Sequence, residues 1–139
     1  MSDPEGLLDT SAVLALRRLR DPSLLPDVAL ISAITLAELS VGPLVASDDA
    51  ERARRLAQVQ QAEADFDPIP FDAPAARAYA QVAAAYRQSG RKPTARSFDA
   101  MIAATAIANG LPLYTANPAD FAGIDGLVVR AVPAPGREG

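Results

Sequence analysis

Four acidic residues stand in segments that are far apart in the chain but similar in composition. In each segment the carboxylate lies beside small, apolar or hydroxylated residues, and the four are Asp9, Glu38, Asp99 and Asp120. The sequence contains no His and no Cys, so oxygen atoms are the only strong metal ligands that it offers. Oxygen ligands favour Mg2+ or Mn2+ over zinc. The pattern predicts one acidic metal site, with Mg2+ as the expected cofactor and Mn2+ as its substitute.

The same two absences limit the kinds of catalysis that are open to the chain. Without Cys there is no thiol nucleophile, disulfide or CxxC centre, and without His the usual general base near neutral pH is missing. Catalysis therefore has to use carboxylates, hydroxyls, amides, Arg, Tyr or the single Lys92.

The net charge of -4 argues against a nucleic-acid enzyme, which normally carries a basic surface. A carboxylate cluster that is neutralised only when metal binds makes this formal charge misleading, however. One stretch concentrates positive charge, at Arg77, Arg87, Arg91, Lys92 and Arg96. The ordinary interpretation of these residues is a solvated helix face.

The elements that must position the four acids alternate between strand and helix. Apolar runs predict strands at 6–8, 27–32, 69–71, 113–115 and 128–132. Helices are predicted at 12–20, from Thr35 onwards, at 49–65, from Asp72 to about Ser89, and at 97–109. This order favours an α/β protein, a three-layer α/β/α sandwich with a mainly parallel sheet of about five strands. Residues 1–132 are expected to form a single domain, and 133–139 a disordered tail.

The predicted elements bring the acids to one edge of the sheet. Sites in open parallel sheets form beyond the carboxyl ends of the strands. Asp9 and Asn117 directly follow predicted strands, and Glu38 and Asp99 fall in the first turns of predicted helices. The four segments are therefore expected to meet at that edge.

Three of the acids also have an ordinary structural interpretation. Asp9 is placed to cap the helix that follows it, and Glu38 with Thr35 matches the S/T-x-x-E capping box. Asp120 would be a first-turn acid after an Asn117 cap.

Asp99 is harder to explain in this way. Ile102, Ala103 and Ala106 follow it on the same, apolar face of its helix. A carboxylate at the head of a buried stripe needs a partner, which is either the amides of the helix N-terminus or a cation.

Four motifs together resemble a known family over roughly residues 6–130. They are LLDTSA at 7–12, TLAELSVG at 35–42, FDAMIAATA at 98–106 and LYTANPADF at 113–121. The set resembles PIN-domain ribonucleases of the VapC type, which are toxins of bacterial toxin–antitoxin pairs.

The resemblance implies a Mg2+-dependent endoribonuclease in which a metal-activated water cleaves RNA. It implies that Asp9, Glu38 and Asp99 ligate the metal, with Thr10 and Thr115 as hydroxyls that orient ligands or waters. Asn117 stands where many relatives carry Asp, and Asp120 would replace that ligand. The implied catalytic set is thus Asp9, Glu38, Asp99, Asn117 and Asp120.

The resemblance also implies partners. A VapB-type antitoxin would cover an apolar groove, for which the candidates are Leu14, Leu36, Leu39, Leu44 and Val45. A homodimer is expected on the same ground. The sequence shows no signal peptide and no membrane-spanning segment, so no membrane partner and a cytoplasmic location are expected.

Two other functions compete with this one. The chain could be a catalytically silent PIN-like interaction domain, whose carboxylates serve only as caps. It could also be a phospho-accepting receiver-type signalling module, which gathers acids around Mg2+ but needs a strand-end Lys. Lys92, the only Lys, lies in a predicted loop, which disfavours the receiver.

Overall fold

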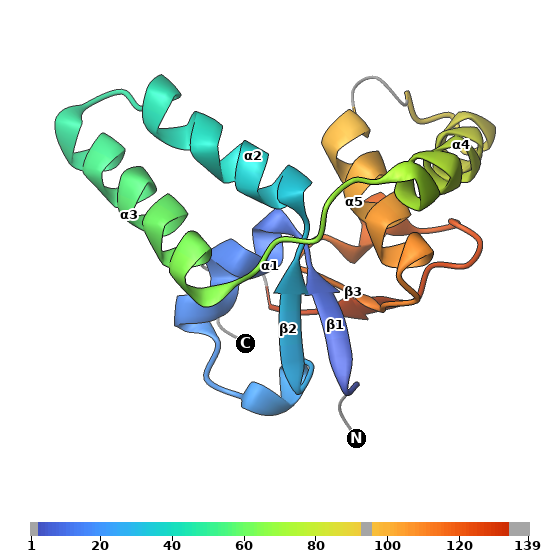
Figure 1. The fold of residues 1–139 in the computed structure, drawn as a ribbon, viewed down its shortest axis with the longest axis horizontal. Coiled ribbons are helices and arrows are strands. Elements are labelled where there is room, and N and C mark those ends of the chain that lie inside the picture. Colours follow the sequence, from blue (N-terminus) through green and yellow to red (C-terminus); the bar gives the residue numbers. More distant parts are fainter. Residues whose placement is uncertain (1–2, 93–95, 134–139) are drawn as a thin grey trace.

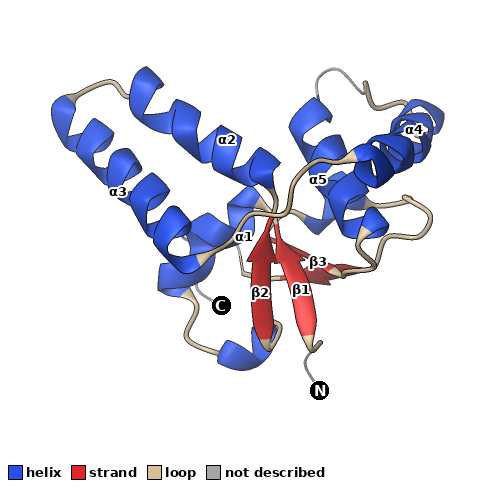
Figure 2. Ribbon diagram, in the orientation of Figure 1, coloured by secondary structure: helices blue, strands red, loops and turns tan. Residues whose placement is uncertain are grey.

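Four short apolar runs form one sheet in which all strands are parallel. The computed structural model describes residues 3–92 and 96–133. Its strands are β1 (Glu5–Leu8), β2 (Val28–Ile31), β3 (Leu113–Thr115) and β4 (Val129–Ala131), in the order β2-β1-β3-β4. Figure 2 shows β1, β2 and β3 below α2, α4 and α5. Because β1 lies between β2 and β3, the residue that follows it comes to the middle of the carboxyl edge.

The predicted fifth strand is wrong. Ile69 makes only an isolated bridge to Ser32, beyond the end of β2. Its N–H donates to the Ile31 carbonyl, and its carbonyl accepts from the Ala33 N–H. Pro68 and Pro70 flank it and have no N–H to donate, so pairing cannot extend in either direction. The sheet therefore has four strands instead of about five.

In the described part of the chain five α-helices connect and cover the strands, and each begins near its predicted position. They are α1 (Thr10–Ala15), α2 (Ala33–Val41), α3 (Asp49–Asp65), α4 (Ala73–Gln88) and α5 (Ser97–Ala108). The chain also forms short 3-10 turns, at η1 (Leu16–Arg18), η2 (Pro22–Leu24), η3 (Gly42–Val45) and η5 (Pro118–Phe121). The helix predicted at 12–20 is thus shorter than expected and ends in η1.

Alternate side chains of the sheet face two separate cores, which confirms the three-layer arrangement. Leu7 and Leu113 pack in a core with α4 and α5, while Leu8 and Tyr114 pack in a core with α1, α2 and α3. Successive residues of a strand point to opposite faces, so the pairs Leu7–Leu8 and Leu113–Tyr114 each contribute to both cores. Figure 1 shows the α2–α3 pair and the α4–α5 pair rising on opposite sides above the sheet.

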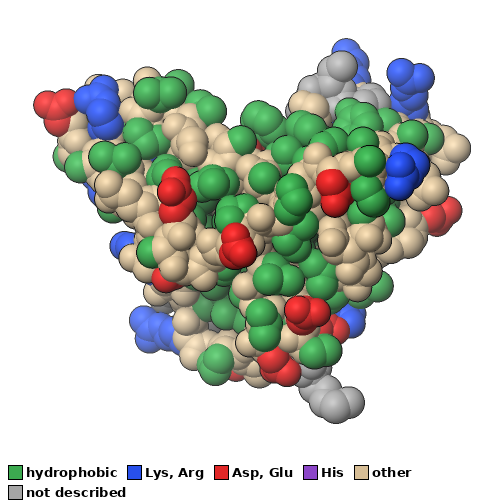
Figure 3. Space-filling model, in the orientation of Figure 1, with side chains coloured by type: hydrophobic (Ala, Val, Ile, Leu, Met, Phe, Trp, Pro, Cys, Tyr) green, Lys and Arg blue, Asp and Glu red, His purple; other side chains and the backbone are tan. Residues whose placement is uncertain are grey.

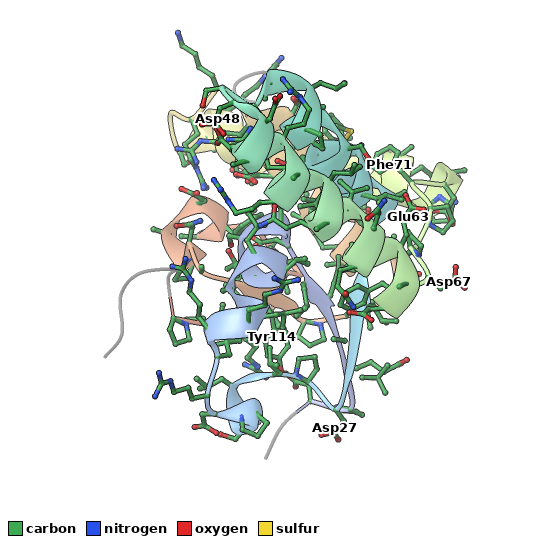
Figure 4. All side chains as sticks on the ribbon, turned by 90° about the vertical axis from the view of Figure 1, so that its left-hand side faces the viewer. Asp27, Asp48, Glu63, Asp67, Phe71 and Tyr114 are labelled. Atoms are coloured by element: carbon green, nitrogen blue, oxygen red, sulfur yellow. The ribbon has the colours of Figure 1, made fainter. Side chains whose placement is uncertain are left out.

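Tyr114 sets a close contact across the sheet. A Cβ on Gly6 would lie 2.5 Å from its ring, so only Gly fits there. The Tyr114 hydroxyl donates to Asp3 at 2.5 Å, which ties the start of the chain to β3. In Figure 4 Tyr114 lies inside the molecule, whereas Glu63 and Asp67 lie along α3 and the segment after it.

Within residues 3–92 and 96–133 no helix is long and apolar enough to cross a membrane. Apart from Pro133, the predicted tail lies outside the described residues, as does the middle of the loop before α5.

Candidate active site

Asp9 is buried at the carboxyl end of β1, and both of its carboxylate oxygens are held. Its side chain is the N-cap of α1, with Oδ1 accepting from the Ala12 N–H at 2.8 Å and from Ser11 Oγ at 2.7 Å. Oδ2 accepts from Thr115 Oγ1 at 2.5 Å. Asp9 is only 4% exposed. The predicted cap is confirmed, and the same carboxylate also joins α1 to the end of β3.

Glu38 reaches the same edge from α2. Its Oε1 accepts from Thr10 Oγ1 at 2.6 Å, and the Thr35 hydroxyl lies 3.2 Å from that of Thr10. The predicted capping box is wrong, because Ser32 caps this helix by accepting from the Thr35 N–H. Glu38 therefore lies one turn further into the helix than expected, where its side chain is free to face α1.

Two hydroxyl groups lock the turn after β3 against α1. Ser11 Oγ accepts from the Ala116 N–H at 2.9 Å, and Thr115 Oγ1 accepts from the Asn117 N–H at 3.0 Å. Since both hydroxyls also donate to Asp9, the orientation of that carboxylate is fixed by the end of β3.

Asp99 and Asp120 approach from the other side of the edge and share one Arg. Asp99 lies in the first turn of α5, and Asp120 lies in η5. Nη1 of Arg96 is 2.8 Å from Oδ1 of Asp120 and 3.9 Å from Oδ2 of Asp99. The side chains of all three residues are about one-third exposed.

The main chain of Asp120 is clamped by two residues near the end of α4. Its carbonyl accepts from the Tyr86 hydroxyl at 3.2 Å and from Arg91 Nη1 at 2.6 Å. Arg91 also donates from Nη2 to the Ala122 carbonyl and lies over the Tyr86 ring, 4.3 Å from its centre. These contacts fix η5, and with it the direction of the Asp120 side chain.

The pKa values of Asp9, Glu38 and Asp99 show that each of these groups lies near other carboxylates. Burial, the largest cause, and the charges of Asp120, Asp9 and Glu38 together raise the pKa of Asp99 to about 6, while Arg96 lowers it. Burial also raises the pKa of Asp9 in spite of its hydrogen bonds, with a further contribution from Asp120. The pKa of Glu38 is raised by burial and by the charge of Asp9. Such mutual repulsion requires that the four groups converge.

The donor set suits a hard divalent cation, although the side chains as placed do not yet surround one. Among the described residues, no three acidic side chains are close enough together to ligate a single ion. Asp9 is engaged by its hydroxyl donors, and Asp120 pairs with Arg96. A cation would relieve the repulsion that raises these pKa values, and every donor is an oxygen, as Mg2+ prefers. Rotation of these side chains would be needed to bring their oxygens around one cation.

Figure 3 shows a notch in the surface between α2 and α5, the helices that carry Glu38 and Asp99. These two helices contact each other. The side chains of Asp99 and Asp120 are about one-third exposed, so solvent reaches this part of the site.

Comparison with known proteins agrees with this geometry. The model of the PIN domain family matches residues 7–127. The chain belongs to the PIN domain family. Ribonuclease VapC5 of Mycobacterium tuberculosis is 41% identical over 123 residues, which are 87% of this chain and 88% of that protein. Ribonuclease VapC1 of Rickettsia felis is 33% identical and covers 91% of this chain and 95% of its own length.

Solved structures of VapBC proteins have a fold similar to that of this chain. The crystal structure of VapBC-5 from M. tuberculosis, a member of the VapBC family of toxin–antitoxin systems, matches with a TM-score of 0.79 at 35% identity, over 93% of this chain and 99% of that one. DNA-bound VapBC from Salmonella typhimurium matches with a TM-score of 0.71 at 26% identity, over 93% and 97% of the two chains. The PIN-like fold is confirmed, and the receiver-type alternative is wrong.

The PIN fold brings together most of the residues that the sequence singled out. Six of the predicted site residues converge, and they are Asp9, Thr10, Glu38, Asp99, Thr115 and Asp120. Asn117 is exposed, and its side chain does not make the predicted cap hydrogen bond at the start of η5. Its N–H, instead, holds the Thr115 hydroxyl.

Four residues around this PIN site were not predicted. Ser11 donates a hydrogen bond to Asp9, and its position two residues after Asp9 in the sequence was the signal that could have revealed it. Arg96 lies three residues before Asp99, a spacing that puts the two on one helix face. Arg91 and Tyr86 act through the main chain of a residue 29 or more positions away, and no local pattern indicates this.

Proposed function

We propose that this protein is a divalent-metal-dependent endoribonuclease and the toxin of a VapBC-type pair. The observation that carries the proposal is the convergence of four carboxylates at the carboxyl edge of the sheet, where neighbouring carboxylates raise the pKa values of Asp9, Glu38 and Asp99. The PIN fold and relatives named ribonucleases support it.

Asp9, Glu38 and Asp99 are the proposed ligands of Mg2+, for which Mn2+ would substitute. Asp120 is the proposed fourth acid, and Asn117 lies at the rim as a polar neighbour of the substrate. When bound, the metal would lower the pKa of a water and neutralise charge on the scissile phosphate.

The remaining residues of the site hold the ligands in place. Thr115 and Ser11 would orient Asp9 through their short hydrogen bonds, and Thr10 would do the same for Glu38. The Arg91–Tyr86 clamp would keep Asp120 directed at the site. Fixed ligands lower the reorganisation that the reaction requires, which is the main contribution that a protein makes to metal-assisted cleavage.

Exposed apolar residues support an antitoxin partner. Of the predicted groove residues, Leu44 is 82% exposed, and Val45 and Leu14 are also exposed. The prediction is wrong for Leu39, which is 6% exposed and belongs to the core, and Leu36 packs against that core. A groove between α1, η1 and α3 contains the predicted Leu14 and adds other lining residues, among them Val13, Leu16, Gln58 and Ala62.

Large apolar groups left in water favour a protein partner. We therefore propose that a VapB-type antitoxin segment covers the face formed by α1, α3 and η3. A homodimer and a cytoplasmic location, where RNA is available, belong to the same proposal. Light scattering of the chain alone and with its antitoxin would measure both associations.

The decisive test compares Asp99→Asn with the wild-type protein on single-stranded RNA. Wild-type protein should cleave in Mg2+ and be inactive in EDTA, and the variant should lose at least 100-fold in rate, an order of magnitude typical for a lost electrostatic group in an active site (about 10²–10³). Glu63→Gln, on the exposed side of α3, is the matched control and should cleave normally. Equal cleavage by wild type and Asp99→Asn would refute the proposal, and no cleavage by either would favour the silent interaction domain.

A further inference from the structure

Arg96 is the one residue of the acidic cluster that the proposed reaction has not used. It occupies the N-cap position of α5, where its side chain makes no cap hydrogen bond because a guanidinium has no acceptor for the helix N–H groups. The guanidinium is turned instead toward the site, where Nη1 contacts Asp120 at 2.8 Å and lies 3.9 Å from Asp99. It thereby connects α5 with η5, two of the elements that carry proposed ligands.

The charge of Arg96 is the only positive charge that pairs with these acids in the described part of the chain. Arg91 is close by, but its guanidinium is committed to the main-chain carbonyls of Asp120 and Ala122. Four carboxylates and one guanidinium leave the cluster with a formal charge of -3. Arg96 thus already neutralises part of the negative charge of Asp99 and Asp120, as a divalent cation would.

The contacts of Arg96 with Asp99 and Asp120 are exposed enough for another cation to replace the guanidinium. The side chains of Arg96, Asp99 and Asp120 are 38%, 30% and 34% exposed, so water reaches all three. Ion pairs with this exposure are weak and are broken without a large cost. A divalent cation carries twice the charge and ligates oxygen directly, so it can displace the guanidinium.

A displaced guanidinium would remain beside the substrate. Arg96 directly precedes α5 and lies three residues from Asp99, so its displaced side chain stays close to the site. The planar guanidinium donates two parallel hydrogen bonds to phosphate, a geometry that Lys cannot reproduce. RNA that enters the site brings phosphates to this position.

We propose that Arg96 is a resident counter-cation that competes with the divalent metal for Asp99 and Asp120 and, once displaced, binds a phosphate of the RNA. This inference rests on the proposed function, since it concerns the same site. Arg96 thus links metal loading to substrate binding.

Metal binding in the absence of RNA tests the first part of the proposal, the competition between Arg96 and the metal. Calorimetric titration of the full chain with Mn2+ should give Arg96→Gln an affinity about two- to fivefold tighter than wild type, the range expected for loss of an exposed ion pair. Arg96→Lys keeps the charge and should stay close to wild type. Arg87→Gln, an exposed Arg in the last turn of α4, is the matched control and should bind Mn2+ like wild type.

Steady-state cleavage of RNA at saturating Mn2+ tests the second part of the proposal, the binding of an RNA phosphate by Arg96. Arg96→Gln should raise KM severalfold with little change in kcat, and Arg96→Lys should restore KM only in part. If Arg96 had a purely structural role, Arg96→Gln would not bind Mn2+ more tightly than wild type. It would also not raise KM without changing kcat.

The outcomes separate this inference from the proposed function. If wild type binds Mn2+ and cleaves RNA while Arg96→Gln matches it in both Mn2+ affinity and KM, the role of Arg96 is overturned and the nuclease stands. Weaker Mn2+ binding by Arg96→Gln would also overturn it, because Arg96 would then support the metal. If wild type binds no Mn2+, both proposals fall.

Discussion

The replacement of Asp99 by Asn should stabilise the metal-free protein at neutral pH. The native pKa of Asp99 is about 6, against an ordinary value of 3.8, because of burial and three neighbouring carboxylates. Between these two pH values the native protein binds more protons than the unfolded chain. Its stability therefore falls as the pH rises through this interval, and the full loss is present above pH 6.

The size of the effect follows from the shift. A rise from 3.8 to about 6 corresponds to roughly 3 kcal/mol of unfavourable free energy for the ionised form. The Asp99 side chain is 30% exposed, and screening by water reduces the expected gain from Asp99→Asn to about 1–2 kcal/mol at pH 7. At pH 4 native Asp99 is already protonated, so the gain should largely vanish.

Urea unfolding of both proteins in EDTA and low salt, at pH 7 and pH 4, measures this difference. Glu63→Gln serves as the control and should change the free energy of unfolding by less than about 0.5 kcal/mol at either pH. A variant that is less stable than wild type at pH 7, or a gain that is equal at both pH values, would refute the claim that Asp99 is held in a repulsive cluster. The same substitution is expected to abolish cleavage, so the site gains function at the expense of stability.

Three further predictions concern the supports of the site. Gly6→Ala should destabilise the protein by about 1–3 kcal/mol in urea unfolding, because the new Cβ would lie 2.5 Å from the Tyr114 ring, and unchanged stability would disprove that contact. Arg91→Gln should slow RNA cleavage at least tenfold, as expected (about 1.4 kcal/mol) when the clamp on the Asp120 main chain is lost, and cleavage at the wild-type rate would show that the clamp is dispensable. Mg2+ at 100 times its Kd should stabilise wild type by about 2.7 kcal/mol in a thermal melt, and a gain of equal size in Asp99→Asn would place the metal elsewhere.

The sequence was sufficient for the layers of the fold because hydrophobic runs and cap residues are local signals. The strand at 69–71 was mistaken because the apolar character of Ile69 and Phe71 was given more weight than the missing N–H groups of the prolines around Ile69. The start of α2 was mistaken for a similar reason. Ser32 and Thr35 both match cap residues, and the position of Ser32 directly after β2 decides between them.

The site was predictable as a set of acids but not as a network. Asp9 directly follows β1, Glu38 lies on the helix after β2, and Asp99 lies in the first turn of α5, so the parallel sheet brings them to one edge. The contacts of Arg96 with Asp120 and of Arg91 with its main chain depend on how α4, α5 and η5 pack, which no short-range pattern records. Both Arg residues were therefore assigned to a solvated helix face, which is wrong for them.

The convergence of the carboxylates on one cation can be measured directly. Crystals of the full chain grown with Mn2+ should show an anomalous difference peak bonded to oxygens of Asp9 and Asp99, with Glu38 in contact directly or through a water. In the same crystals the Arg96 guanidinium should no longer contact Asp99. A peak that lies away from these carboxylates, or no peak at a Mn2+ concentration that supports RNA cleavage, would contradict the account.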